Sequence, residues 1–191
     1  MRKTMKGINI PVIGFAAYSG TGKTTLLTRI VEILKARNLR VGIVKHAHHN
    51  FDIDYPGKDS HRLRKAGASQ VLIGSSLRWA LMVENDVKEP KPLEFHIKNM
   101  DLDNLDLILI EGFKLANIPK IEIHRPSLGN PPLYPEDENV IALATDAGAG
   151  MDLAIPVLDL NDPAAIADFI VDHFLGNVVM LKRSGKINND L

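Results

Sequence analysis

The chain has 191 residues, of which 45% are hydrophobic and 24% are charged, as is typical of one globular domain with its own apolar core. Lysine plus arginine and aspartate plus glutamate both number 23, so the zero net charge excludes a bulk field that would favour nucleic acid or a membrane surface. The absence of cysteine excludes disulfides, thiolate metal sites and cysteine nucleophiles, and it fits a cytoplasmic protein.

The first recognisable feature is a strand, a glycine-rich loop and a helix in succession. Residues 8–17 form an apolar run that predicts a buried parallel strand. Residues 17–24 read AYSGTGKT and fit the phosphate-loop pattern G-x-x-x-x-G-K-(S/T), except that Ala17 replaces the first glycine. Apolar residues at helical spacing then run from Lys23 to a predicted stop at Asn38. This context favours a site for a nucleoside triphosphate.

Each residue type in the loop suits that ligand. Gly20 and Gly22 let the backbone curl so that successive N–H groups face the phosphates. Lys23 is the candidate catalytic residue that brings a positive charge to the β and γ phosphates. The Thr24 hydroxyl can bind Mg²⁺, and the helix N-terminus adds its dipole to the same anion site.

Later segments alternate between apolar runs and amphipathic stretches. The predicted strands are residues 40–45, 69–73, 78–83, 105–110, 120–124, 139–144 and 155–160. The predicted helices are one capped by Asp59 or Ser60, one over residues 93–98, and a last one capped by Asp162 and ended by Gly176. Trp79 lies in an alternating strand, so we expect a core or interface residue.

This alternation predicts an α/β protein. We expect a single P-loop NTPase-like domain with a mostly parallel sheet and helices on both faces. The domain should cover residues 1–176, followed by a polar tail over residues 177–191. Ligands of such sheets bind at the carboxyl ends of the strands, so the residues after each apolar run are the candidates for chemistry.

Glu111 ends the second strongly apolar run. Phosphate-loop enzymes place the carboxylate that holds Mg²⁺ at such a strand end, which makes Glu111 a candidate metal ligand together with Thr24. Asp106 lies at the start of the same strand and should face the opposite edge of the sheet.

The polar segment 46–59 follows a strand, so we expect it to overhang the triphosphate. Asp52 is a candidate Mg²⁺ ligand, and Asp54 is a candidate catalytic residue that orients an attacking water. Lys58 could neutralise phosphate charge. An ordinary solvated loop explains these charges equally well.

Three histidines, His46, His48 and His49, raise the question of a zinc site. No cysteine assists them and no carboxylate spacing completes a known site, so polar contacts to phosphate or to a partner are favoured. Their role stays open.

The base of the nucleotide is not specified by a motif, because the Asn-Lys-x-Asp signature of many GTPases is absent. Asp146 follows the predicted strand 139–144, where it could accept hydrogen bonds from a guanine edge, and Asp159 and Asn161 compete for that role. Spacing alone leaves GTP and ATP both open.

Four stretches of this sequence together closely resemble the MobB family, the adapter proteins of molybdopterin-guanine dinucleotide biosynthesis. They read FAAYSGTGKTTLL at 15–27, KHAHHNFDIDYPGKDSHRLRKAGA at 45–68, RWALM at 78–82 and LDLILIEGFK at 105–114. The resemblance implies a P-loop NTPase fold in the branch that also holds dethiobiotin synthetase. It also implies GTP binding with Mg²⁺, slow hydrolysis and a homodimer.

By the same resemblance, the expected partners are the molybdopterin guanylyltransferase MobA, which joins GMP to molybdopterin, and molybdopterin-bearing proteins. The alternative function on this fold is an ATP-dependent small-molecule kinase or ligase. The residues then expected to hold the nucleotide are Ser19, Gly20, Thr21, Gly22, Lys23, Thr24 and Thr25, with Lys58 and Asp146 as further candidates.

Overall fold

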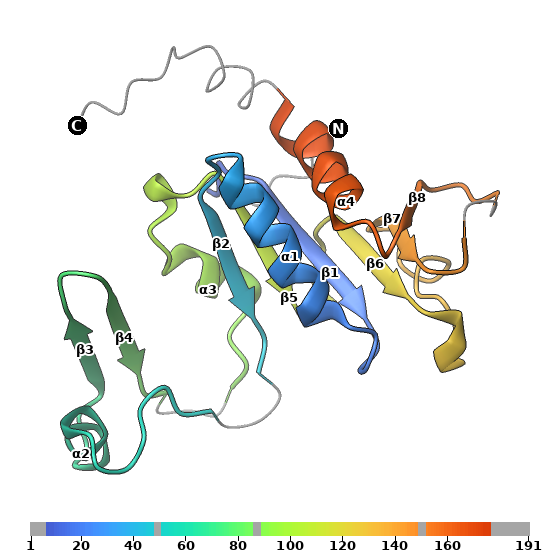
Figure 1. The fold of residues 1–191 in the computed structure, drawn as a ribbon. Coiled ribbons are helices and arrows are strands. Elements are labelled where there is room, and N and C mark those ends of the chain that lie inside the picture. The colour runs from blue at the N-terminus through green and yellow to red at the C-terminus, as the bar shows by residue number, and fades with distance from the viewer. Residues whose placement is uncertain (1–6, 48–50, 86–88, 149–151, 177–191) are drawn as a thin grey trace. The chain divides into compact units, whose positions relative to one another are not determined.

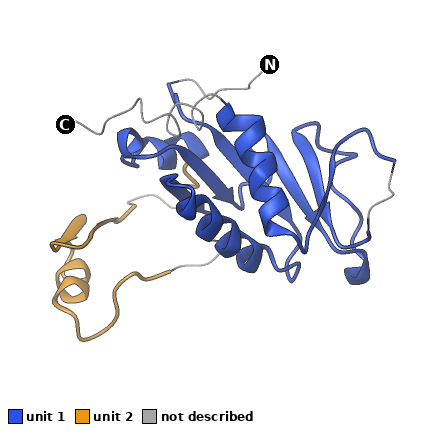
Figure 2. Cartoon of the chain, turned by 45° about the horizontal axis from the view of Figure 1, so that its top comes forward, with its two compact units in different colours: residues 1–46, 93–191 blue, residues 47–92 orange. Residues whose placement is uncertain are grey.

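The computed structural model describes residues 7–47, 51–85, 89–148 and 152–176. The chain divides into two compact units, which are coloured separately in Figure 2. Unit 1 consists of Met1–His46 and Leu93–Leu191, and unit 2 is Ala47–Pro92. The polar tail predicted over residues 177–191 lies outside the described residues.

Unit 1 is built on a parallel sheet, as the sequence predicted (Figure 1). Its strands are β1 Val12–Ala17, β2 Val41–Lys45, β5 Leu107–Glu111, β6 Lys120–His124, β7 Val140–Thr145 and β8 Val157–Asp159. They lie in the order β2-β5-β1-β6-β7-β8, and each neighbouring pair is parallel. The carboxyl ends of all these strands therefore meet at one edge of the sheet.

Helices cover both faces of this sheet. They are α1 Lys23–Ala36, α3 Leu93–Lys98 and α4 Pro163–Ile170, which continues as a π-helical turn over Val171–Leu175. Ile13 and Phe15 of β1 pack in one apolar cluster with residues of α1 and α4. Val12 of β1 and Ile108 of β5 belong to a second cluster with α3. Alternate side chains of each strand thus enter opposite layers, which explains why β1 and β5 read as continuous apolar runs.

Several element ends follow the predicted residues closely. Asp162 caps α4, because its Oδ1 accepts hydrogen bonds from the N–H groups of Ala164 and Ala165 at 3.0 Å each. The prediction that the first strand begins at residue 8 is wrong, since β1 begins at Val12. Pro11 has no N–H to donate to a sheet, so the regular strand begins after it, although Ile8 is still buried.

Within the described part of the chain, we find no helix that combines the length and apolar character of a bilayer span.

Unit 2 contains helix α2 (Asp59–Lys65) and an antiparallel hairpin of β3 (Gln70–Gly74) and β4 (Trp79–Val83). Trp79 is not a core residue, because its side chain is 63% exposed within the chain, and the interface alternative stays a prediction. Register places Trp79 on the same face of the hairpin as Leu72 and Leu81, and both of these side chains are exposed as well.

A single arginine joins the parts of unit 2. One terminal nitrogen of Arg64 lies 2.7 Å from a carboxylate oxygen of Asp52 and 2.5 Å from one of Asp54, and the other lies 3.0 Å from Glu84. The side chains of Arg64 and Asp54 are only 9% and 4% exposed. This guanidinium therefore ties the segment before α2, the helix and the end of the hairpin together. Its hydrogen bond holds the pKa of the Asp54 carboxyl below the ordinary value of 3.8.

The lowered pKa of Asp54 predicts that unit 2 loses stability in acid. The folded pKa lies below the unfolded one, so the stabilisation is present above about pH 4 and is lost as the pH falls through the folded pKa. Amide hydrogen exchange of α2 and the hairpin, measured from pH 6 to 3 and corrected for intrinsic rates, should show this loss below about pH 4. Asp54→Asn should lower protection at pH 6 and remove most of its pH dependence.

Asp59→Asn is the matched control for this experiment, because Asp59 is an exposed carboxylate of the same unit, and its ion pair joins it to its helical neighbour Arg62, at 3.6 Å. It should behave as the wild type does. Equal exchange profiles for the two variants would contradict the structural role of Asp54.

Candidate functional site

The predicted strand, loop and helix are all present in unit 1. The loop leaves the carboxyl end of β1 after Ala17 and enters α1 at Lys23. Gly20 and Gly22 have φ angles of 82° and 86°, a left-handed conformation that side chains with a Cβ rarely adopt. The Thr21 hydroxyl turns back into the loop and donates to the Tyr18 carbonyl at 3.0 Å. The glycines and this hydrogen bond give the loop its curled path.

Glu111 lies beside the start of α1, as predicted from its strand-end position. The Thr24 hydroxyl donates to Glu111 Oε1 at 3.3 Å, and Lys23 Nζ lies 4.0 Å from the same oxygen. Lys45 Nζ lies 3.3 Å from the other oxygen, Oε2. The carboxylate is therefore held between a hydroxyl and an ammonium group of α1 and a second ammonium group from the end of β2.

This arrangement fits Mg²⁺. The Thr24 hydroxyl and the Glu111 carboxylate are both oxygen donors, which Mg²⁺ prefers, and adjacent ligands of an octahedral Mg²⁺ lie about 3 Å apart. The observed separation of 3.3 Å between Oγ1 and Oε1 is close to that value. Thr24 and Glu111 would thus be the protein ligands, and phosphate and water oxygens would complete the shell.

The turn after Glu111 fixes its position. Gly112 has a φ angle of 93°, and a Cβ built on it would lie 2.6 Å from the Cβ of His46. The His46 N–H donates to the Glu111 carbonyl at 2.8 Å, and its ring meets the Phe113 ring edge-on at 4.9 Å between centroids. Phe113 itself has a φ angle of 48°, which is strained for a bulky residue. Only glycine at position 112 allows β2 and β5 to end this close together.

The histidines give no metal centre in the described part of the chain. His48 and His49 lie outside the described residues. Among the residues that are described, no group of three or more histidine, aspartate or glutamate side chains is placed to hold a metal ion.

Asp146, the candidate for base recognition, pairs with Arg125. Asp146 follows β7, and Arg125 follows the neighbouring strand β6. Arg125 Nη1 donates to Asp146 Oδ2, and its Nε donates to the Thr21 carbonyl of the glycine-rich loop at 2.9 Å. Asp159, a competing candidate, accepts a hydrogen bond from the Asn161 N–H at 2.8 Å. Asp146 is therefore the candidate that the structure links to the loop.

Three other predicted residues, Asp52, Asp54 and Lys58, lie in unit 2. Asp52 and Asp54 bond to Arg64, and Lys58 Nζ lies 5.4 Å from the centroid of the Tyr55 ring. These contacts give the two carboxylates a structural role within their own unit. Their participation in Mg²⁺ binding or catalysis stays a prediction.

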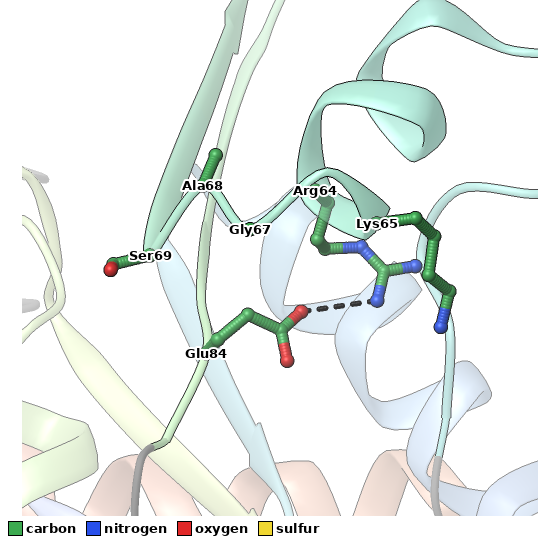
Figure 3. A pocket seen from close by; sticks show the side chains of 6 residues that line it. All are labelled: Arg64, Lys65, Gly67, Ala68, Ser69 and Glu84. Carbon is green, nitrogen blue, oxygen red and sulfur yellow. Dashed lines mark hydrogen bonds and ion pairs between the residues drawn. The ribbon is translucent and has the colours of Figure 1, made fainter.

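Unit 2 also has a pocket of about 230 Å³ (Figure 3). Its lining residues are Arg64, Lys65, Gly67, Ala68, Ser69 and Glu84. Figure 3 shows Glu84 reaching Arg64, so the one carboxylate of the lining is engaged by a guanidinium. None of the residues predicted from the sequence as ligands lines this pocket.

Sequence reasoning missed two cations of the unit 1 site, Lys45 and Arg125. Lys45 is the last residue of β2, and Arg125 directly follows β6. Both positions satisfy the rule that ligands bind at the carboxyl ends of parallel strands. The rule holds for every strand end, but it does not say that Lys45 would meet Glu111 or that Arg125 would meet the glycine-rich loop, because these partners are distant in the sequence.

The close approach at Gly112 predicts a large cost for a Cβ there. Gly112→Ala should lower the free energy of unfolding by about 3 kcal/mol, because strain at positive φ adds to a clash with backbone-anchored His46. Gly129→Ala is the control, since Gly129 has a φ of 69° and open space around it, and it should cost only about 1 kcal/mol. Urea denaturation followed by far-ultraviolet circular dichroism suits this test, because the one tryptophan, Trp79, lies in unit 2. Equal losses in the two variants would contradict the steric argument.

Comparison with known proteins identifies relatives over most of the chain. Residues 12–146 match the family model MobB, described as Molybdopterin guanine dinucleotide synthesis protein B. The chain is 49% identical over 164 residues to a "Molybdopterin-guanine dinucleotide biosynthesis adapter protein" of Escherichia coli (strain K12), with 85% of this chain and 93% of the relative covered. A protein of the same name from Haemophilus influenzae (strain ATCC 51907 / DSM 11121 / KW20 / Rd) is 44% identical over 173 residues, covering 87% and 93%.

A solved structure shares the fold of this chain. The crystal structure of Bacillus subtilis MobB superposes with a TM-score of 0.67 at 24% identity, over 86% of this chain and 98% of that one. At this identity the likeness concerns the fold alone. Since the family model covers more than half of the chain and the E. coli and H. influenzae relatives match it over most of their length, the chain belongs to the MobB family.

Proposed function

We propose that this protein is a GTP-binding adapter of molybdopterin-guanine dinucleotide biosynthesis with slow intrinsic GTP hydrolysis. It would assist the guanylyltransferase MobA in attaching GMP to molybdopterin. The observation that carries the nucleotide part is the placement of Glu111 against Thr24, Lys23 and Lys45 beside the glycine-rich loop. The names of the E. coli and H. influenzae relatives support the adapter role. The homodimer, contact with molybdopterin-bearing proteins and the cytoplasmic location belong to the same proposal.

Backbone N–H groups and side chains of unit 1 would bind different parts of the triphosphate and its metal. The N–H groups of the loop and of the first turn of α1 face the phosphates, and Lys23 adds a positive charge. Lys23 can leave Glu111 without disturbing the fold, because their contact is long, at 4.0 Å. Thr24 and Glu111 would hold Mg²⁺, which supplies charge neutralisation to the β and γ phosphates when it is bound.

The surroundings of Glu111 support slow hydrolysis. A general base must reach the attacking water with an available oxygen. Both Glu111 oxygens are engaged, Oε1 by Thr24 and Lys23 and Oε2 by Lys45. This arrangement suits a metal ligand better than a base, so the chain would retain GTP rather than turn it over rapidly.

Calorimetric titration with GTP and then ATP, each with Mg²⁺, tests the proposed nucleotide. The wild type should prefer GTP, and Lys23→Ala should weaken binding by about tenfold or more, because a charge-assisted contact to the phosphates is lost. Lys35→Ala, at an exposed position in the last turn of the same helix, should bind as the wild type does. A preference for ATP would overturn the adapter proposal in favour of a small-molecule kinase or ligase.

The proposed metal ligand is tested by the gain in affinity that Mg²⁺ brings. For the wild type, GTP should bind at least about tenfold more tightly with Mg²⁺ than with EDTA, whereas Glu111→Gln should keep little of this gain. Glu32→Gln is the control, because Glu32 is an exposed carboxylate on α1 that pairs with Arg29. A full Mg²⁺ gain in Glu111→Gln would remove Glu111 from the metal site.

A further inference from the structure

Arg125 lies where the phosphate side and the base side of the proposed site meet. Residues His124 and Thr145 are register partners at the ends of β6 and β7, so Arg125 and Asp146 are the next residues along two adjacent strands. The Arg125 side chain bonds to both neighbours, to Asp146 through Nη1 and to the Thr21 carbonyl through Nε at 2.9 Å. One guanidinium thus spans the end of β7 and the glycine-rich loop.

The bond to Thr21 has a consequence for the loop. The Thr21 carbonyl and the Gly22 N–H belong to one planar trans peptide group, in which the C=O and N–H bonds point in opposite directions. When Arg125 holds the carbonyl on its own side, the Gly22 N–H is aimed at the other side of the loop. The next carbonyl, that of Gly22, accepts the first hydrogen bond of α1 from Leu26 at 3.0 Å. The peptide is therefore held from both directions, although glycine at position 22 would otherwise let it rotate.

The pairing with Asp146 argues that Arg125 acts through geometry rather than through charge. The Asp146 carboxylate neutralises the guanidinium, and the pair is partly buried, with side-chain exposures of 31% and 25%. A neutralised pair adds little net attraction for an incoming anion. The planar fork of arginine can still donate in two directions at once, which a lysine ammonium cannot reproduce in the same geometry.

We propose that Arg125 is a positioning residue that aims the Gly22 N–H at a bound triphosphate and links this loop to Asp146. The proposal deepens the proposed function, because the same site would take the phosphates of GTP. The proposed role of Arg125 concerns only the binding of the triphosphate group, so it can be tested without a nucleotide base. Inorganic tripolyphosphate with Mg²⁺ is therefore the primary probe.

The test compares Arg125→Gln and Arg125→Lys by calorimetric titration with Mg²⁺-tripolyphosphate. Both should weaken binding by about tenfold, because each removes the bond that orients the peptide. Arg37→Gln is the matched control, since Arg37 pairs with Asp168 at 2.7 Å between α1 and α4, away from the loop. It should leave affinity within about twofold of the wild type. Circular dichroism and the thermal midpoint check that each variant is folded.

The second variant, Asp146→Asn, tests the link between the two sides. Tripolyphosphate has no base, so any loss of its affinity in this variant reports on Arg125 and not on guanine recognition. We expect a loss of about threefold, because Arg125 keeps Thr21 but loses the partner that fixes its orientation. Asp146→Asn also tests the positioning role of Arg125 if the Arg125→Gln variant does not fold. Unchanged tripolyphosphate affinity in Asp146→Asn would overturn the link, and so would an increased affinity, which would show that Asp146 only masks the charge of Arg125.

Two further results would overturn the positioning role. Wild-type affinity in Arg125→Gln would show that the loop needs no such support. If Arg125→Lys kept the wild-type affinity for tripolyphosphate while Arg125→Gln lost affinity, residue 125 would act only by attracting the phosphates with its positive charge. A protein that binds tripolyphosphate as expected in all variants, yet prefers ATP to GTP, would contradict the proposed function and leave the role of Arg125 intact.

Discussion

The parallel pairing of β2, β5, β1 and β6 is the constraint on which the candidate site depends. It makes Lys45 and Glu111 register partners on β2 and β5, and it brings Phe15 of β1 level with Glu111 just before the loop begins. Parallel strands end at a common edge, so charged residues far apart in the chain meet there without any local motif joining them. The completely buried residues 107–110 of β5 favour this alignment, because a shift by one residue would move a charged residue at one end of the run, Asp106 or Glu111, toward the apolar layers. The apolar interior therefore sets the geometry of the polar edge.

Unit 2 is stabilised in a different way. Its buried residues include Met82 and the carboxylate Asp54, and the ion cluster around Arg64 joins its helix to its hairpin. A buried charge that loses its partner is far more costly than an exposed one, so each member of this cluster constrains the others. Polar residues in the segment 51–59 thus have a structural task as well as the functional one predicted for them. A charged loop after a strand is ambiguous between the two until its contacts are known.

The parts of the site that could be predicted from sequence are those whose signal is local. The apolar run, the curled loop and the start of α1 follow one another within 8–23, and Glu111 ends a run that is apolar on both faces. Lys45 and Arg125 escaped notice because their partners lie 66 and 104 positions away, and only the strand order and register bring them together. The exposure of Trp79 could not be predicted for a related reason, since alternation identifies a strand but does not say whether a layer covers it.

The charges at the strand ends also bear on how the proposed ligand would enter. Two ammonium groups lie within 4.0 Å of the Glu111 carboxylate, so a bare Mg²⁺ that approached this carboxylate would meet their repulsion. A triphosphate that arrived with its metal would reverse this balance, because its negative charge would attract Lys23 away from Glu111 and would leave the carboxylate available as a metal ligand. Lys45 remains at Oε2 and keeps the carboxylate in place. The proposed site would therefore bind the nucleotide together with its metal rather than the metal first. The glycine-rich loop, which Arg125 contacts at Thr21, already has its curled conformation without the ligand.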